Sequence, residues 1–266
     1  MDHLNKLEAL KEKISKEKNI LIAFSGGIDS ALLLKVARDV LGKGAFCVIL
    51  DAKTVPRSEI KDAESFVKDL HVGYDIVKFS ILKDKDFIKN PFNRCYLCKK
   101  ASSEILRNIA AERGIKRVAD GLNLSDLSEY RPGIKASDEE GIWHPFVDLK
   151  IEKADIRRIS KDIGIPFWDK PSSACLVSRI PYGEEITREK LRMIEEAEEF
   201  LKEEGFEVVR VRIHERIARI EILKDDFDAF FHVKKEIAKE LKQIGFKYVT
   251  LDLEGYRSGS IDKDLL

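Results

Sequence analysis

A glycine-rich turn between an apolar run and a helical pattern is the feature that most constrains the fold of this chain. Residues 19–24 read NILIAF, a continuous apolar stretch that predicts a buried strand of a parallel sheet. Residues 31–42, ALLLKVARDVLG, then predict a helix that ends at Gly42. The segment between them, SGGIDS at 25–30, therefore has to lead from the end of a strand straight into a helix.

This turn has the residues of an anion-binding loop. Gly26 and Gly27 can adopt backbone angles that other residues avoid, so the chain can turn sharply and bring its amides onto an anion. The helix that follows offers unpaired N–H groups and the positive end of its dipole, and Ser25 and Ser30 add hydroxyl donors. Asp29 would repel a phosphate, but its position is explained if it helps to hold Mg²⁺ or shapes the loop. The spacing fits neither the Walker A motif nor the dinucleotide-binding fingerprint, and an ordinary glycine-rich turn is the alternative.

Further along, the chain alternates between strand and helix patterns. Apolar runs predict the strands, and amphipathic patterns at helical spacing predict the helices between them. The predicted strands are 19–24, 45–52, 74–79 and 117–121, and the predicted helices are 3–17, 31–42, 58–70, 99–114 and 151–164. Such alternation predicts an α/β fold with a doubly wound parallel sheet.

A stretch rich in Ser, Pro and Gly, 170–187, interrupts this pattern and predicts a loop or linker. After it come patterns for a helix, two strands joined near 214–216, a second helix and a last strand, which together predict a small α+β domain. We therefore predict one domain with the glycine-rich loop at 1–170 and a smaller, substrate-binding domain at 171–266.

The composition narrows the class of protein. Charged residues make up 36% of the 266 residues, yet the formal net charge is zero, so no nucleic-acid partner is implied. No apolar run approaches the ~20 residues of a membrane span, and the amphipathic N-terminus lacks the pattern of a signal peptide. We expect a cytoplasmic protein with no membrane partner, in which cysteines indicate metal binding or catalysis more than disulfides.

The residues S-G-G-x-D-S resemble the PP-loop of the ATP pyrophosphatases, a family that includes GMP synthetase, NAD synthetase and tRNA thiolation enzymes. The resemblance implies that ATP is cleaved to AMP and pyrophosphate while a substrate oxygen becomes adenylated. The stretch DGLNLSD at 120–126 resembles the family's G-T-N-x-x-D segment, with Leu122 in place of Thr. It implies that Gly121 and Asn123 lie at the nucleotide, and Asp126 could reach Mg²⁺ through an oxygen ligand. The alternative is an Asn/Asp turn.

The cysteines lie in different surroundings. Cys47 lies in AFCVIL, inside a predicted strand, where a free thiol acts as a small apolar side chain. Cys95 and Cys98 form a C-x-x-C motif beside basic residues, and Cys175 lies in SSACLVSRIPYG. A structural zinc site needs four protein ligands, and the context of His144 does not single it out as the fourth. A redox dithiol at the C-x-x-C motif stays open. So does a 4Fe-4S cluster on three cysteines, in which the iron without a protein ligand could bind a sulfide.

Taken in order, the PP-loop, the C-x-x-C motif, the segment CLVSRIPYG at 175–183 and the VRVR and ARIEI segments resemble the LarE family over nearly all of the chain. The resemblance implies an ATP-dependent sulfur transferase that builds the nickel-pincer cofactor of lactate racemase. Its small-molecule substrate would be pyridinium-3,5-dicarboxylate mononucleotide. ATP would adenylate a ring carboxylate, sulfur would displace AMP, and a second round would give the dithiocarboxylate. The resemblance also implies a homo-oligomer.

Two sulfur sources are known in this family. In one group a single cysteine, matching Cys175, gives up its sulfur and becomes dehydroalanine. In the other group three cysteines bind a 4Fe-4S cluster that carries an extra sulfide, and Cys95 and Cys98 place this sequence there. We thus expect ATP, Mg²⁺ and a 4Fe-4S cluster as cofactors, with these three cysteines as cluster ligands and Asp29 and Asp126 at the magnesium ion.

The expected substrate site lies in the C-terminal part of the chain. Arg210 and Arg212 alternate with apolar residues, so both point to one face of a strand. Guanidinium groups suit phosphate and carboxylate, and this pair matches the family's arginine pair that binds the phosphate of the mononucleotide. Arg179 could contact the substrate carboxylate, and Glu198 and Glu221 could support the site. The alternative for the arginine pair is a solvated strand face.

Three other functions stay open. A tRNA thiolation enzyme could use the same cluster, but a zero net charge and the lack of a basic tract give no sign of an RNA-binding surface. An amidotransferase-type ligase such as NAD synthetase would leave the C-x-x-C motif without a role. A non-enzymatic nucleotide-binding or iron–sulfur carrier would release no pyrophosphate from ATP.

Overall fold

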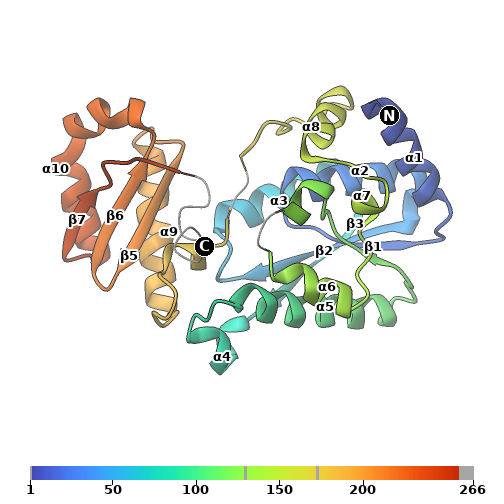
Figure 1. Cartoon of the computed structure of the whole chain (residues 1–266), viewed down its shortest axis with the longest axis horizontal. Coiled ribbons are helices and arrows are strands. Elements are labelled where there is room, and N and C mark those ends of the chain that lie inside the picture. The colour runs from blue at the N-terminus through green and yellow to red at the C-terminus, as the bar shows by residue number, and fades with distance from the viewer. Residues whose placement is uncertain (1, 129–130, 172–173, 258–266) are drawn as a thin grey trace. The chain divides into compact units, whose positions relative to one another are not determined.

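The structure is a computed structural model of the chain that describes residues 2–128, 131–171 and 174–257. Contacts between residues divide the chain into two compact units (Figure 1). Unit 1 consists of Met1–Ile81 and Asn93–Ser173, and unit 2 consists of Leu82–Phe92 and Ala174–Leu266. The domains expected from the sequence, 1–170 and 171–266, keep residues 82–92 in the first domain, whereas the contacts group them with the second unit.

Unit 1 is built on a parallel sheet of four strands. These are β1 (Ile20–Ala23), β2 (Ala45–Ala52), β3 (Gly73–Phe79) and β4 (Val118–Ala119), in the order β3-β2-β1-β4. The predicted α/β fold with a doubly wound parallel sheet is confirmed. From β1 the chain proceeds to β2 and β3 on one side and later adds β4 on the other, so the strand order reverses beside β1. Open parallel sheets bind ligands at the carboxyl ends of the strands where the strand order reverses. In this sheet that place is the carboxyl ends of β1 and β4.

Helices cover both faces of this sheet (Figure 1). One face carries α1 (His3–Ser15), α2 (Ile28–Leu41), α3 (Arg57–Asp69) and α8 (Lys153–Asp162), and the other carries α5 (Arg94–Glu112). Successive side chains of a strand point to opposite faces. In β1, Ile20 and Ile22 therefore join the core under α2, while Leu21 joins the core under α5. The continuous apolar run in the sequence is explained because both faces are covered.

Cys47 on β2 belongs to the core under α2 and is fully buried. Burial raises the pKa of its thiol to about 12. The prediction that this cysteine acts as a small apolar core side chain is confirmed.

Helix α5 begins earlier than the sequence analysis predicts. It starts at Arg94 and not at residue 99, so Cys95 and Cys98 lie in its first two turns instead of ahead of it. The stretch from 92 to 113 contains no Gly or Pro, so nothing in it prevents the helix from starting early. Predicting the start of the helix at residue 99 was therefore wrong.

The remaining elements of the first unit are short. They are α6 (Gly133–Glu139), α7 (Pro145–Asp148) and the 3-10 turns η1 (Gly42–Gly44) and η3 (Leu124–Ser128). Helix α6 packs on α5, on the same side of the sheet (Figure 1). A further 3-10 turn, η2 (Ile81–Lys83), leads from β3 into unit 2.

The described residues of unit 2 form a three-stranded sheet and two long helices. β5 (Val209–His214) and β6 (Ile217–Ile222) form the predicted hairpin, and β7 (Tyr248–Leu251) pairs with β6 in parallel. α9 (Arg188–Glu203) packs on β5, and α10 (Phe227–Ile244) packs on α9 and β7. The short elements are α4 (Lys85–Ile88), η4 (Leu176–Arg179) and η5 (Lys224–Asp226).

The segment 82–92 is held in unit 2 by hydrogen bonds to the loop before α9. Asn90, which is fully buried, donates from Nδ2 to the carbonyls of Ile180 (3.2 Å) and Pro181 (2.7 Å). The N–H of Ile186 donates to the carbonyl of Ile88 (2.8 Å). In the described part of the chain, no helix is both long and apolar enough to cross a membrane.

Candidate functional site

The glycine-rich loop forms a turn between β1 and α2 that its own serines hold. The Ser30 hydroxyl donates to the Gly27 carbonyl (3.0 Å) and accepts from the Ser25 N–H (3.2 Å). Gly26 has a φ of 79°, and a Cβ at this position would lie 3.2 Å from the Cβ of Ala63 on α3. The loop thus needs a glycine at 26 for its backbone conformation and for its packing.

The segment after β4 lies directly against the first turn of α2. A Cβ at Gly121 would lie 2.7 Å from the backbone nitrogen of Ser30 and 2.8 Å from the carbonyl carbon of Asp29. Asn123 is fully buried, and its backbone N–H and its Nδ2 both donate to the Asp126 carboxylate (3.0 and 2.8 Å). These bonds form the Asn/Asp turn that the sequence left as an alternative. Contact of Gly121 or Asn123 with a nucleotide stays a prediction.

A cavity of about 370 Å³ lies within unit 1 between these two segments. This volume falls within the roughly 300–1,000 Å³ that is typical of small-molecule sites. Its lining includes apolar residues from β2, α3 and α5, namely Val48, Ile49, Leu50, Ile60 and Leu106. It also includes the loop serines and charged residues, namely Ser25, Ser30, Asp29, Lys99, Asp120, Asp126 and Arg131. A cavity lined by both apolar and charged residues suits a base joined to phosphates.

Both carboxylates that the sequence assigns to Mg²⁺ line this cavity and lie beside cations. Asp29 accepts from the Lys153 ammonium at 2.6 and 2.8 Å, and Asp126 lies 3.0 Å from the Arg131 guanidinium. Burial raises the pKa of Asp126, and the hydrogen bond from Asn123 opposes this shift. Among the residues that the structure describes, no group of three or more His, Cys, Asp or Glu side chains could hold a metal ion. Magnesium is commonly held by one or two carboxylates together with phosphate oxygens, and its site here stays a prediction.

A buried polar cluster in the cavity wall was missed by the sequence analysis. Asp120, at the end of β4, accepts from Lys99 Nζ at 2.8 Å and lies 2.7 Å from His144 Nδ1. Burial opposes ionisation of Asp120, but Lys99 and His144 outweigh it, so the pKa of this carboxyl is lowered. Helical spacing places Lys99, Ser102 and Leu106 on the cavity side of α5. That periodicity could have identified Lys99, whereas no local pattern links it to Asp120.

The cysteines proposed as cluster ligands belong to different units. Cys95 is exposed and Cys98 is half-buried, both at the start of α5 in unit 1. Cys175 is exposed and immediately precedes η4 in unit 2. The structure describes each unit by itself, and the iron–sulfur cluster stays a prediction.

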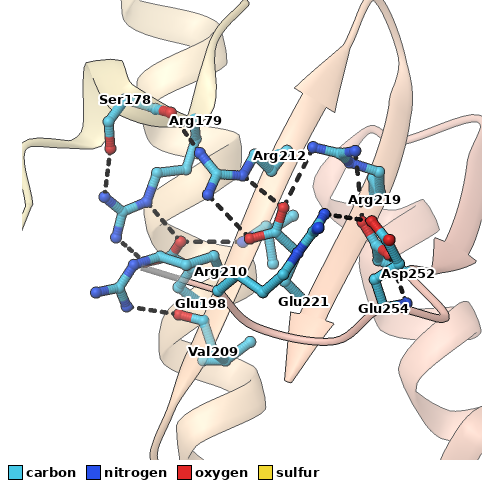
Figure 2. A network of polar contacts seen from close by, with 12 residues as sticks. Ser178, Arg179, Glu198, Val209, Arg210, Arg212, Arg219, Glu221, Asp252 and Glu254 are labelled. Carbon is cyan, nitrogen blue, oxygen red and sulfur yellow. Dashed lines mark hydrogen bonds and ion pairs between the residues drawn. The ribbon is translucent and has the colours of Figure 1, made fainter. Parts of the chain in front are cut away.

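In unit 2, Arg179 and Glu198 form a buried ion pair (Figure 2). Arg179 Nε and Nη2 donate to the two Glu198 oxygens at 2.8 and 2.9 Å. Arg179 Nη1 also donates to the carbonyls of Ala174 (2.9 Å) and Cys175 (3.2 Å). Arg179 is only 1% exposed, so its guanidinium is occupied by the protein itself. The predicted contact with a substrate carboxylate stays untested.

A second buried ion pair lies beside the first one (Figure 2). Arg212 donates to the two Glu221 oxygens at 2.7 and 2.9 Å and to the Ser178 carbonyl at 2.7 Å. Arg212 is 6% exposed and Glu221 is 2% exposed. The alternative of a solvated strand face is therefore wrong for Arg212.

Arg210 lies on the same strand face but has different partners. Its guanidinium is half-buried, donates to the Val209 carbonyl at 2.7 Å and lies 5.3 Å from the centre of the Tyr256 ring. Burial and the nearby charge of Arg179 lower its pKa. In the part of the chain that the structure describes, no carboxylate forms an ion pair with Arg210.

Two further residues, Arg219 and His214, were not predicted from the sequence and lie on the same hairpin. Arg219 faces Arg212 across the hairpin and lies 3.2 Å from Glu221 and 3.4 Å from Asp252. His214 continues the alternation that begins at Arg210, and burial together with Arg219 lowers its pKa. The alternation VRVRIH could have identified His214.

Comparisons with known proteins identify relatives along nearly the whole chain. Residues 4–108 match a family described as NAD synthase. An uncharacterized protein of Synechocystis sp. is 40% identical over 263 residues, which is 98% of each chain. The pyridinium-3,5-bisthiocarboxylic acid mononucleotide synthase of Lactiplantibacillus plantarum is 35% identical over 249 residues, 93% of this chain and 90% of that protein.

More distant similarity reaches GMP synthases. A glutamine-hydrolyzing GMP synthase of Chlamydia caviae is 22% identical over 222 residues, which is 74% of this chain and 42% of that protein. Because the match to the Lactiplantibacillus synthase extends over nearly the whole of both proteins, the chain belongs to the LarE family of PP-loop enzymes.

Proposed function

We propose that this protein is an ATP-dependent sulfur transferase that converts a carboxylate of pyridinium-3,5-dicarboxylate mononucleotide into a thiocarboxylate. The observation that carries the proposal is the cavity of about 370 Å³ beside the loop Ser25–Ser30, in a chain 35% identical to a synthase of the bisthiocarboxylic acid mononucleotide. A phosphate loop supplies the activating nucleotide, and the name of the relative indicates the product.

We assign ATP to this cavity. The backbone amides and hydroxyls of Ser25–Ser30 would bind its phosphates at the start of α2, where N–H groups lack partners within the helix. The cavity residues Val48 and Leu50, whose side chains share one face of β2, would pack against the adenine. Asp29 and Asp126 would hold Mg²⁺, which neutralises phosphate charge when it is bound. Lys153 would then give up part of its contact with Asp29.

The reaction needs an activated carboxylate because a free carboxylate is a poor electrophile. A carboxylate oxygen of the substrate attacks the α-phosphorus of ATP, the bond from that phosphorus to the bridging oxygen breaks, and pyrophosphate leaves with the electron pair. A sulfur nucleophile then attacks the acyl carbon, the carbon–oxygen bond to the adenylate breaks, and AMP leaves. Lys99 lines the cavity and can stabilise the negative charge that develops on the phosphates.

We assign the sulfur source to the three cysteines Cys95, Cys98 and Cys175 as ligands of a 4Fe-4S cluster. When bound, such a cluster has one iron without a protein ligand, which can hold a sulfide for delivery. Cys95 and Cys175 are exposed residues, and Cys98 is half-buried. The second candidate is sacrificial transfer from Cys175, which is favoured by its exposure. In that case its thiolate attacks the acyl carbon, and loss of the Cα proton with cleavage of the Cβ–S bond leaves dehydroalanine.

Arg210 is the group that we assign to the phosphate of the mononucleotide. It is a half-buried cation, and it has no carboxylate partner among the described residues. Guanidinium groups bind phosphate through paired hydrogen bonds. Arg212 would support it from the same strand face while remaining paired with Glu221.

Pyrophosphate release tests the proposal. The protein, ATP and Mg²⁺ should release pyrophosphate when the dicarboxylate mononucleotide is present and not when tRNA or ammonia replaces it. Release with tRNA would favour a tRNA thiolation enzyme, release with ammonia would favour a ligase, and no release would favour a carrier. The homo-oligomer implied by the family is tested by light scattering of the purified protein.

The sulfur source needs a separate measurement. Iron and acid-labile sulfide should be measured after anaerobic purification of the wild type and of Cys98→Ala. A cluster predicts about four of each per chain in the wild type and their loss in the variant. No iron in either protein, with loss of the mass of hydrogen sulfide at Cys175 after turnover, would show the sacrificial route.

A further inference from the structure

We propose that Arg179 and Glu198 are positioning residues for Cys175, which hold the peptide on both sides of this cysteine and so set the reactivity of its thiol. The inference rests on the proposed role of Cys175 in sulfur transfer. It differs from the role that the sequence suggested for Arg179, which was contact with the substrate carboxylate.

The donors of Arg179 are directed at the backbone that carries Cys175. One edge of the guanidinium binds both oxygens of Glu198, at 2.8 and 2.9 Å. Nη1 on the opposite side binds the carbonyl of Ala174 at 2.9 Å and that of Cys175 at 3.2 Å, together with the Ser178 hydroxyl at 2.8 Å. The group therefore links the cysteine segment to α9.

Glu198 connects this link to the sheet of unit 2. Its Oε1 accepts from Arg179 and also from the Val211 N–H at 3.0 Å, in the middle of β5. Glu198 is 4% exposed, so the ion pair is shielded from water. Charge-assisted hydrogen bonds are strong and directional in such surroundings.

A second guanidinium holds the same segment from the other end. Arg212 donates to the Ser178 carbonyl at 2.7 Å, and the Ser178 N–H donates to the Cys175 carbonyl at 2.9 Å. Figure 2 shows the two guanidinium groups side by side beneath Ser178. The backbone of Cys175 is thus bound from several directions, while the residue itself is exposed.

This arrangement combines a held backbone with an exposed cysteine residue. In the sacrificial route, a Cys175 thiolate that is held in place reacts faster because it loses less motional freedom on reaching the acyl carbon. In the cluster route, the same fixed backbone would keep Cys175 in position as a ligand. Arginine suits the task because its planar group binds a carboxylate and carbonyls at the same time, whereas lysine presents a single ammonium. The network therefore has a role in chemistry even if none of its buried members touches the substrate.

Alkylation of Cys175 tests the inference without turnover. The full-length protein with Cys95→Ser and Cys98→Ser serves as the parent, and Cys47 stays unreactive because it is buried. The rate of iodoacetamide modification at Cys175 is followed by peptide mass mapping across a pH series. Arg179→Lys and Glu198→Gln should each lower the rate of modification on the order of tenfold, which corresponds to the loss of one charge-assisted hydrogen bond.

Two controls separate positioning from general loss of stability. Arg192→Lys alters an exposed ion pair with Glu196 on the same helix α9 and should leave the rate unchanged. Glu221→Gln alters the other buried pair, so it should lower the melting temperature as Glu198→Gln does but change the Cys175 rate less. If Arg179→Lys does not fold, Glu198→Asp keeps the charges and tests the same link.

The inference is overturned if Arg179→Lys and Glu198→Gln, or Glu198→Asp, react at Cys175 with the parent's rate and pH profile. An increase of KM for the mononucleotide in those variants would then show that Arg179 binds substrate directly. Because alkylation needs neither ATP nor the mononucleotide, failure of the proposed sulfur transfer would leave this result unaffected.

Discussion

A methyl group added at Gly121 should push the end of β4 away from α2 and weaken ATP binding. In Gly121→Ala the new Cβ would lie 2.7 Å from the Ser30 nitrogen, 2.8 Å from the Asp29 carbonyl carbon and 3.0 Å from the Asp29 Cβ. The first two are backbone atoms of the phosphate loop, so no side-chain rotation relieves the contact. Overpacking of this kind costs about 1–3 kcal/mol. If the loop takes up the displacement, the same free energy weakens ATP binding by about 5- to 150-fold.

Gly27→Ala is the matched control for the loss of stability, because it adds the same methyl group to the phosphate loop at a position where the protein leaves room for it. Its Cβ would meet nothing nearer than the Ser25 hydroxyl at 3.5 Å. Its expected cost is about 1 kcal/mol or less, from the change at the start of α2. Titration calorimetry with ATP and Mg²⁺ measures affinity, and urea unfolding measures stability. Equal losses of stability in the two variants, or an unchanged ATP affinity in Gly121→Ala, would refute the steric reasoning.

Three further predictions concern charged side chains. Glu198→Gln leaves the buried Arg179 without its counter-ion and should lower the free energy of unfolding by about 3–5 kcal/mol. Glu196→Gln, which alters an exposed ion pair, should lower it by about 1 kcal/mol or less. Urea unfolding measures both losses, and similar values would contradict the assignment of a buried pair. In the folded protein the pKa of Asp120 lies below its ordinary value. The ionised Asp120 carboxylate therefore stabilises the folded protein above about pH 4, and this contribution is lost as the pH falls towards the pKa of the folded state. The stability advantage of the wild type over Asp120→Asn should therefore shrink on acidification, and an advantage that grows in acid would oppose this view. Arg210→Ala should weaken mononucleotide binding on the order of tenfold with little change in melting temperature, and unchanged binding would remove this residue from the site.

The layout of unit 1 could be predicted from the sequence because its signals are local. Continuous apolar runs such as 19–24 and 45–52 mark strands that are covered on both faces. The glycine-rich loop lies between a strand and a helix, so its position at the carboxyl edge of the sheet follows from chain order. Gly121 and Asp126 come to the same edge for the same reason.

Partnerships between distant charged residues could not be predicted. Charged side chains make up 36% of the chain, so each acid has many possible partners and no local pattern selects one. Arg179 and Glu198 are separated by the loop before α9, and Lys99 and Asp120 lie on a helix and a strand whose packing decides their contact. The sequence therefore identified Arg179, Glu198, Arg212 and Glu221 as candidates without showing that they pair with one another.

The measurement that tests the central proposal most directly is a single-turnover reaction analysed by mass spectrometry. The anaerobic protein is mixed with ATP, Mg²⁺, sulfide and pyridinium-3,5-dicarboxylate mononucleotide, and the nucleotide products are quantified. The account predicts a mononucleotide in which sulfur replaces a carboxylate oxygen, together with equal amounts of AMP and pyrophosphate. AMP and pyrophosphate without a sulfur-containing mononucleotide, or no ATP cleavage at all, would contradict it.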